Sequence, residues 1–282
     1  MKLAVSNIAW APRQRDHAYA MLNEHGIRGL EIAPGLFLDG AKDVFRPTAE
    51  ECEAALAPMR SAGLELVSMQ SLLFGVEGVA LFGGPAERER FEEAMLRAIH
   101  LAGMLGIPNL VFGSPRQRVI PKIMGLEEAE SIAVEVFRRL GDAATAEGTV
   151  LGMESNPKVY GTNFMNNAEE TAAFVARVNH PAIQIILDVG AMHLNGDFET
   201  LPLFVTTHAS KISHVHFSEP YLAPAPADPS QAHRVLQAMS AVRYGRWFSI
   251  EMKALPDGEL TELEPALGRL KRAEQMLEEG AG

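Results

Sequence analysis

Four consecutive strand-like segments in the second half of the chain each end in a residue type that can ligate a metal ion, and this pattern constrains the fold most. The four residues are Glu154, Asp188, His216 and Glu251. They are separated by 34, 28 and 35 residues, which is about one strand-plus-helix unit each time. The spacing predicts that four successive parallel strands bring the four side chains together at one end of a sheet.

The segment from Ile212 to Pro220 carries two histidines. Strand alternation places His214, His216 and Ser218 on one face of this segment. We expect His216 to be the ligand because it lies nearer the strand end. His214 is then expected to lie deeper and to satisfy a buried hydrogen bond.

Eight strand-like segments alternate with eight helical segments along the chain. Division of 282 residues by eight gives about 35 residues per unit, which suits a barrel of about 250 residues with longer loops. We therefore predict the α/β class, with a single (β/α)8 TIM-barrel domain over residues 1–282. A doubly wound open sheet is the alternative, but no glycine-rich phosphate-binding loop follows the first strand. Active sites of such barrels lie at the carboxyl ends of the strands, where the four residues fall.

Composition restricts the partners. The formal net charge is −11 and no run of Lys and Arg occurs, so nucleic acid is disfavoured. Cys52 is the only cysteine, which fits a reducing compartment. No segment approaches the roughly 18 apolar residues of a membrane span, and the first ten residues do not resemble a signal peptide. We expect a cytoplasmic protein without a membrane partner.

Three carboxylates and one imidazole form an oxygen-rich ligand set. Such a set suits one divalent ion, with Mn²⁺, Mg²⁺ or Co²⁺ preferred over a thiolate-seeking ion and Zn²⁺ also accepted. A lone acid at a strand end is usually a solvated side chain. Four in succession are harder to explain that way, because uncompensated buried carboxylates cost several kcal/mol per charge.

Several further residues are candidate substrate contacts, each with a simpler explanation. Arg116 and Lys253 follow strands and could hold an anionic group, although solvation at the surface is the better explanation for either one. His193 follows Asp188 and is either a contact near the metal or a plain loop histidine. Trp10, with Phe37, Phe74 and Phe82, is expected near the top loops, for sugar stacking or ordinary packing.

Two long connections are expected to border the site. Residues 70–84 form an apolar, glycine-punctuated loop that could act as a lid. Residues 219–230 contain four prolines and form a constrained loop.

The motifs MESNP at Glu154, LDVG at Asp188, HVHFSE at His216 and SIEMK at Glu251 resemble those of the xylose-isomerase-like TIM barrels. In ketose 3-epimerases of that family the corresponding four residues bind one divalent ion, commonly manganese, and the two glutamates exchange protons with the substrate. The resemblance implies that Glu154 and Glu251 are the acid and base.

The resemblance extends to Glu219, which matches a substrate-contacting acid. It breaks at Ala191, where many relatives have a histidine; His193 lies two residues further on.

The predicted function is that of a metal-dependent isomerase or epimerase of a small sugar or polyol, acting through an enediolate-like intermediate. An inosose-dehydratase-like lyase and a non-catalytic carbohydrate-binding barrel are the alternatives. An apurinic-site endonuclease fits less well, because such enzymes carry several additional histidines and this chain is acidic. The identity of the sugar, the metal and a homo-oligomeric state are left open.

Overall fold

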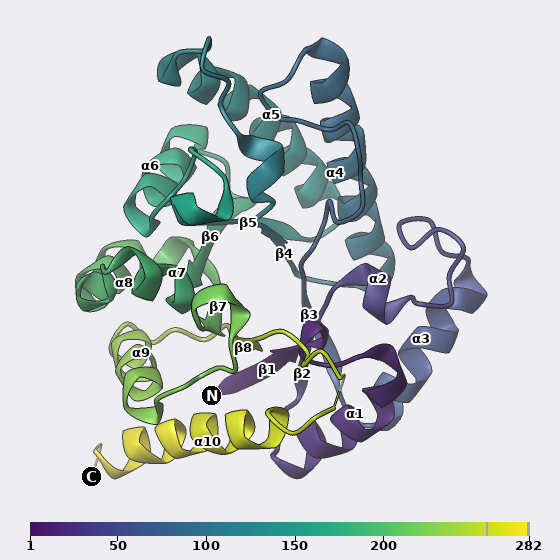
Figure 1. Ribbon diagram of the computed structural model, residues 1–282, viewed down its shortest axis with the longest axis vertical. Coiled ribbons are helices and arrows are strands. Elements are labelled where there is room, and N and C mark those ends of the chain that lie inside the picture. The colour runs from purple at the N-terminus through teal and green to yellow at the C-terminus, as the bar shows by residue number, and fades with distance from the viewer. Residues whose placement is uncertain (258, 281–282) are drawn as a thin grey trace.

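The computed structural model describes residues 1–257 and 259–280. Eight parallel strands pair in sequence order, and β1 pairs with β8, so the sheet is a closed barrel (Figure 1). The predicted (β/α)8 architecture is therefore confirmed. The strands are β1 (Lys2–Ser6), β2 (Gly29–Ile32), β3 (Glu65–Met69), β4 (Asn109–Phe112), β5 (Val150–Glu154), β6 (Ile183–Asp188), β7 (Ile212–Ser218) and β8 (Trp247–Glu251).

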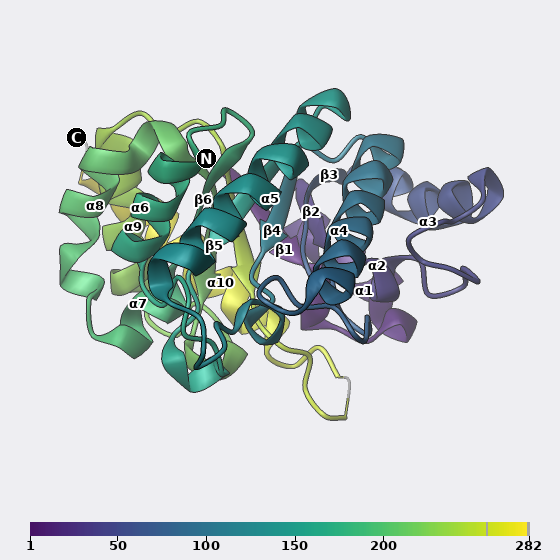
Figure 2. The same cartoon turned by 90° about the horizontal axis from the view of Figure 1, so that it is seen from above.

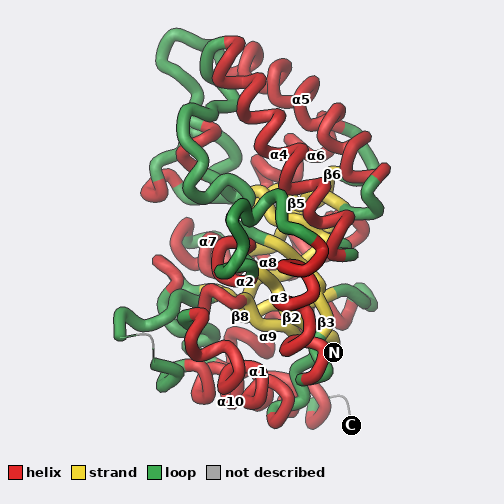
Figure 3. Tube along the Cα trace, turned by 90° about the vertical axis from the view of Figure 1, so that its right-hand side faces the viewer, coloured by secondary structure: helices red, strands yellow, loops and turns green. Residues whose placement is uncertain are grey.

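Helices surround the barrel on its outside (Figures 2 and 3). The helices are α1 (Arg15–Glu24), α2 (Pro34–Phe37), α3 (Ala49–Ser61), α4 (Pro85–Leu105), α5 (Leu126–Ala146), α6 (Ala168–Val178), α7 (Val189–Asn195), α8 (Leu201–His208), α9 (Pro229–Ala241) and α10 (Leu263–Glu279). The short helices α2 and α7 were not anticipated. Helix α7 begins directly after β6 because the Asp188 carboxylate caps it, accepting the Ala191 N–H at 2.5 Å.

Side-chain caps start several of the longer helices. At α3 the Glu51 N–H donates to Thr48 Oγ1 at 3.2 Å, and the Thr48 N–H donates to Glu51 Oε2 at 2.7 Å. At α6 the Glu170 N–H donates to Asn167 Oδ1 at 2.8 Å. These caps satisfy backbone groups that the first turn of a helix leaves without partners.

The apolar core lies between the barrel wall and the helices. Phe112 on β4 packs against Phe91 of α4 and Phe137 of α5, with ring centroids 5.8 and 5.0 Å apart. All three rings are fully buried. Because this layer is apolar, polar side chains on the strands are confined to the barrel interior and its ends.

Three of the four candidate ligands are the last residues of their strands. Glu154, Asp188 and Glu251 end β5, β6 and β8, and His216 lies two residues before the end of β7. The four therefore share the carboxyl end of the barrel. Among the described residues, no helix combines the length and the apolar character needed to cross a bilayer.

Gly29 on β2 lies where side chains of the neighbouring strands leave no room for a larger residue. A Cβ at this position would lie 2.6 Å from Ala4 Cβ on β1 and 2.8 Å from the Trp247 ring on β8. Neither neighbour can withdraw without moving its strand, so Gly29→Ala should lower the free energy of unfolding by about 1–3 kcal/mol. Urea unfolding measures this. The control is Gly35→Ala, since its added Cβ meets nothing within 4 Å, and equal stability of the two variants would contradict the prediction.

Candidate metal centre

The four residues converge on one point at the carboxyl end of the barrel. One ligand atom of each lies within 4.8 Å of the others. His216 Nδ1 is central to the group, at 3.1 Å from Glu154 Oε1, 3.3 Å from Glu251 Oε2 and 3.7 Å from Asp188 Oδ2. The predicted convergence of four strand ends is thus present in the structure.

Neighbouring groups fix the orientation of two of the carboxylates. The Ser218 hydroxyl donates to Asp188 Oδ2 at 2.6 Å, while Asp188 Oδ1 accepts the cap of α7. Asn156 Nδ2 donates to Glu154 Oε2 at 3.2 Å. A Cβ at Gly113 would lie 2.4 Å from that same oxygen, so the glycine leaves room for the Glu154 carboxylate.

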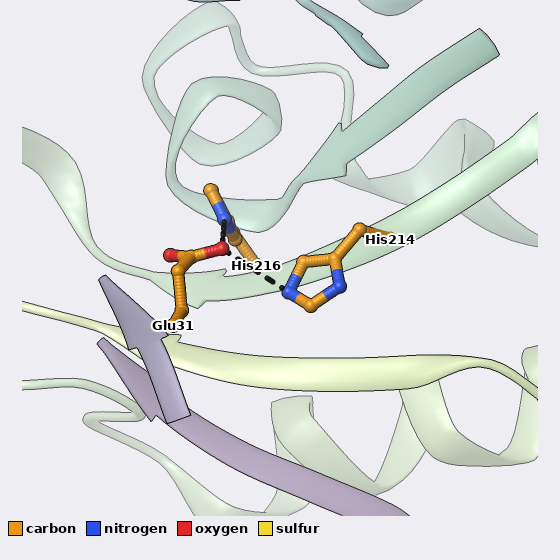
Figure 4. Close-up of side chains that lie close together, drawn as sticks. All are labelled: Glu31, His214 and His216. Atoms are coloured by element: carbon orange, nitrogen blue, oxygen red, sulfur yellow. Dashed lines mark hydrogen bonds and ion pairs between the residues drawn. The ribbon is translucent and has the colours of Figure 1, made fainter. Parts of the chain in front are cut away.

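A fourth acidic residue, Glu31 on β2, lies behind the site. Its side chain is fully buried, and Oε2 is 3.1 Å from His216 Nε2 and 3.3 Å from His214 Nε2 (Figure 4). Gln70 Nε2 donates to the other oxygen, Oε1, at 2.8 Å. Sequence reasoning missed Glu31 because GLEI reads as an ordinary buried strand. The available signal was a charged residue inside such a strand, since a buried charge requires a partner.

Glu31 determines which nitrogen of His216 faces the four-residue site. Burial raises the pKa of Glu31, but the charge and hydrogen bond of His216 outweigh burial and lower this pKa to about 2. An ionised carboxylate only accepts hydrogen bonds, so His216 Nε2 must carry a hydrogen and donate it. Nδ1 is then the nitrogen that faces Glu154, Asp188 and Glu251.

His214 lies deeper in the barrel, as expected. Its Nε2 is 2.7 Å from Ser249 Oγ, and 1% of the residue is exposed. Burial lowers the pKa of His214 to about 4, so this ring is neutral near pH 7. His216 differs: burial lowers its pKa, but Glu31 and Glu251 raise it well above the ordinary value.

Arg118 places a buried positive charge close to Glu154. It is fully buried, and Nη1 donates to the Glu154 backbone carbonyl at 2.8 Å. Its guanidinium carbon lies 5.7 Å from the centre of the Phe112 ring. Burial lowers the pKa of Arg118 to about 9, although the Glu154 charge opposes this, so Arg118 remains a cation near neutral pH. It compensates part of the negative charge of the cluster.

The donor set fits a hard divalent ion. Three carboxylates and one imidazole nitrogen converge, and no thiol is among them. Burial raises the pKa of Glu251 to about 7, reinforced by the charges of Glu154 and Asp188 and opposed by His216. Without an ion, protons on His216 and Glu251 therefore offset the negative charge that an ion would otherwise neutralise.

Glu154, Asp188 and Glu251 line a cavity of about 360 Å³, while His216 lies buried behind them. Glu219 and Lys253, two of the predicted substrate contacts, line it together with Tyr160 and Tyr221. The loop over residues 219–230 is braced by an internal hydrogen bond, in which the Ala227 N–H donates to Glu219 Oε1 at 2.8 Å. This loop borders the cavity as expected.

The other predicted contacts lie elsewhere. Trp10 is buried and packs edge-to-face on Tyr19, with ring centroids 6.2 Å apart. His193 stacks on Phe198 at 4.2 Å and does not line the cavity, so it does not take the place of the histidine missing at position 191. Arg116 lines a neighbouring cavity, as does part of the loop over residues 70–84. Trp10, His193 and Arg116 stay predictions as substrate contacts.

Replacing Glu31 by Gln should weaken metal binding. The amide cannot hold His216 in its Nε2–H form by charge, and groups that orient a ligand in this way typically contribute 10–100-fold in affinity. We expect a 10–100-fold rise in the Mn²⁺ dissociation constant, measured by isothermal titration calorimetry. The control is Glu65→Gln on β3, an exposed glutamate, and unchanged affinity in the Glu31 variant would contradict this role.

Metal binding should release protons. Because the metal-free site holds protons on His216 and Glu251, an ion must displace them, and affinity should rise with pH through about 7 by up to about tenfold per pH unit and proton. Titration of Mn²⁺ at about pH 6 and about pH 8, in buffers of different ionisation enthalpy, counts the released protons. Constant affinity and no proton release across this window would show that the carboxylates do not share protons as described.

Known proteins with this fold include several sugar epimerases. The chain superposes on 3-keto-D-glucoside 4-epimerase YcjR from E. coli with a TM-score of 0.75 at 17% identity, covering 98% of this chain and 99% of that chain. D-Psicose 3-epimerase from Clostridium cellulolyticum H10 gives 0.74 at 15% identity, covering 99% and 98%. The IOLI protein with a bound zinc atom gives 0.71 at 17% identity, covering 98% of each chain. At these identities the likeness shows the fold alone.

Comparison with curated proteins finds no match. A family model described as xylose isomerase-like TIM barrel matches residues 19–273. The match spans most of the chain and agrees with the closed barrel and its strand-end acids. The chain therefore belongs to the xylose isomerase-like TIM barrel family.

Proposed function

We propose that the chain is a metal-dependent isomerase or epimerase that acts on a small sugar or polyol. The observation that carries the proposal is the placement of Glu154 and Glu251. They end the outer two of four adjacent strands, their oxygens both approach His216 Nδ1, and both line the same cavity. Two carboxylates that reach one cavity from different strands suit the removal and return of a proton.

Each glutamate has a defined task in this proposal. When bound, a divalent ion supplies polarisation of a substrate carbonyl and its neighbouring hydroxyl. One glutamate removes a proton from the carbon next to the carbonyl, and an enediolate-like species forms. In an epimerisation the other glutamate returns a proton to the opposite face. In an isomerisation the proton is returned to the former carbonyl carbon, next to the carbon that lost it.

The charge balance permits this exchange. Three carboxylates exceed the charge of one divalent ion by a single negative charge when His216 is neutral. Glu154 or Glu251 can therefore take up a proton while the other carboxylates and His216 keep their places. Asp188 is less suited to proton transfer, because Ser218 and the start of α7 hold both of its oxygens.

The lining of the cavity supports a substrate with several hydroxyl groups. Asn156 lines the cavity, and its Nδ2 donates to Glu154 Oε2 at 3.2 Å, so its amide is part of the polar lining beside the candidate base. Glu219 and Lys253 add an acceptor and a donor to the same cavity, as expected for a site that orients its ligand by a few polar groups.

Two rival functions are separable by experiment. A lyase that removes water from a keto-polyol would use the same proton removal, but its product would be lighter by one water. A non-catalytic carbohydrate-binding barrel would bind a sugar without exchanging protons. The epimerase activities named for structural neighbours favour the isomerase or epimerase assignment.

The test is exchange of solvent deuterium into a panel of ketoses by the manganese-loaded protein. Glu154→Gln and Glu251→Gln keep the side-chain shape but remove the base, so we expect at least about 100-fold slower exchange, the lower limit for general base catalysis. Glu65→Gln, exposed and on a different strand, should exchange at the wild-type rate. Metal content is measured in parallel.

If metallated variants of both glutamates exchange the proton at the wild-type rate, the two-glutamate mechanism is wrong. Loss of water from the product, seen by mass spectrometry, would instead assign the lyase function.

A further inference from the structure

A second cavity, of about 500 Å³, adjoins the cavity above the metal centre. The loop after β3 and the segment after β4 line it. Ser114 and Pro115 line both cavities and form their common wall. The two cavities therefore adjoin at Ser114 and Pro115.

Phe74 presents an aromatic ring at the second cavity. It is 86% exposed, whereas its neighbours Leu72 and Leu73 are 1% and 2% exposed. The Phe74 N–H donates to the Ser71 carbonyl at 3.0 Å, which closes a turn. The loop is thus anchored by two buried leucines while its phenylalanine faces outward. An aromatic side chain left in water gains burial free energy when a ligand covers it.

Polar side chains line the same cavity. They are Glu77, Arg116 and Gln117. None of the three forms a side-chain hydrogen bond or ion pair within the described ranges 1–257 and 259–280. The Phe74 ring therefore lies in a cavity that also offers hydrogen-bond donors and acceptors. This combination suits a pyranose sugar, which has an apolar C–H face and a rim of hydroxyl groups.

The metal-centre cavity has room for one sugar unit. Its volume of about 360 Å³ lies near the lower end of the roughly 300–1,000 Å³ typical of small-molecule sites. The reacting sugar unit and its ion would occupy much of this space. A second sugar unit attached to the first would have to lie across Ser114 and Pro115.

We propose that the second cavity is a glycosyl subsite, in which Phe74 stacks on the second unit of a keto-disaccharide while the reacting unit lies at the metal centre. This inference rests on the proposed function and specifies its substrate class as glycosylated ketoses. Arg116, predicted from the sequence as a substrate contact, would donate to hydroxyl groups of the second unit.

The test compares D-fructose with maltulose and isomaltulose, which carry the same ketose unit with an added glucosyl group. Solvent deuterium exchange gives kcat/KM for each sugar. In the wild type, at least one disaccharide should exceed D-fructose. In Phe74→Ala, the ratio of kcat/KM for that disaccharide to kcat/KM for D-fructose should fall about tenfold, which corresponds to about 1.4 kcal/mol of lost stacking.

Ile123→Ala is the matched control. Ile123 is another apolar residue that is 98% exposed, and it lines neither cavity. The ratio should stay at its wild-type value in this variant. Arg116→Gln should lower the ratio as well, because the amide keeps a donor but loses the charge and the planar fork.

The outcomes separate this inference from the proposed function. Turnover of D-fructose with no preference for a disaccharide, or with a ratio that Phe74→Ala leaves unchanged, overturns the subsite and leaves the proposed function standing. If no sugar exchanges its proton, calorimetric binding of maltulose and isomaltulose decides the subsite: weaker binding in Phe74→Ala supports it, and equal or absent binding overturns it. A change in oligomeric state by size-exclusion chromatography with an unchanged ratio would assign Phe74 to an interface between copies of the chain.

Discussion

The contact between Glu31 and His216 is the interaction on which the candidate site depends. Closure of the barrel brings β2 and β7 close enough for Glu31 Oε2 to lie 3.1 Å from His216 Nε2, with both side chains fully buried. An unpaired carboxylate at this depth would cost several kcal/mol. The imidazole satisfies it, and the carboxylate in turn directs His216 Nδ1 toward the three acids at the strand ends. One buried pair therefore links the barrel interior to the chemistry at its end.

The surroundings of the site accommodate an unusual density of negative charge. Four carboxylates, counting Glu31, lie around one imidazole that is shared by both candidate metal-binding groups. Arg118 contributes a buried cation beside Glu154, and burial raises the pKa of Glu251 to about 7, so the metal-free chain can protonate this carboxyl near neutrality. A divalent ion would replace these protons. The acidic cluster is therefore suited to bind either protons or a metal ion.

The barrel fold and the acids at its strand ends could be predicted, because both follow from patterns of residues that are close together in the sequence. Alternating segments of about 35 residues indicate a (β/α)8 barrel, and the position of each acid along its own strand determines its height in that barrel. Glu31 was missed because its role depends on a partner that lies 185 positions away. For Trp10 the sequence left sugar stacking and ordinary packing open, and the structure shows the ring buried against Tyr19. Loop packing of this kind depends on tertiary contacts that no local pattern encodes.

The same distinction explains why family membership informs the metal centre more than the substrate. Strand positions are fixed by the hydrogen-bonded barrel, a fold that this chain shares with structures of 15–17% identity, so the fold sets the height of each strand-end residue. Loop positions have no such constraint. In the segment after β6, the Ala191 N–H donates to Asp188 Oδ1, while the nearby His193 side chain stacks on Phe198. Substrate selection in this chain must therefore be inferred from its own loops, where Phe74, Asn156 and Lys253 line the two adjoining cavities.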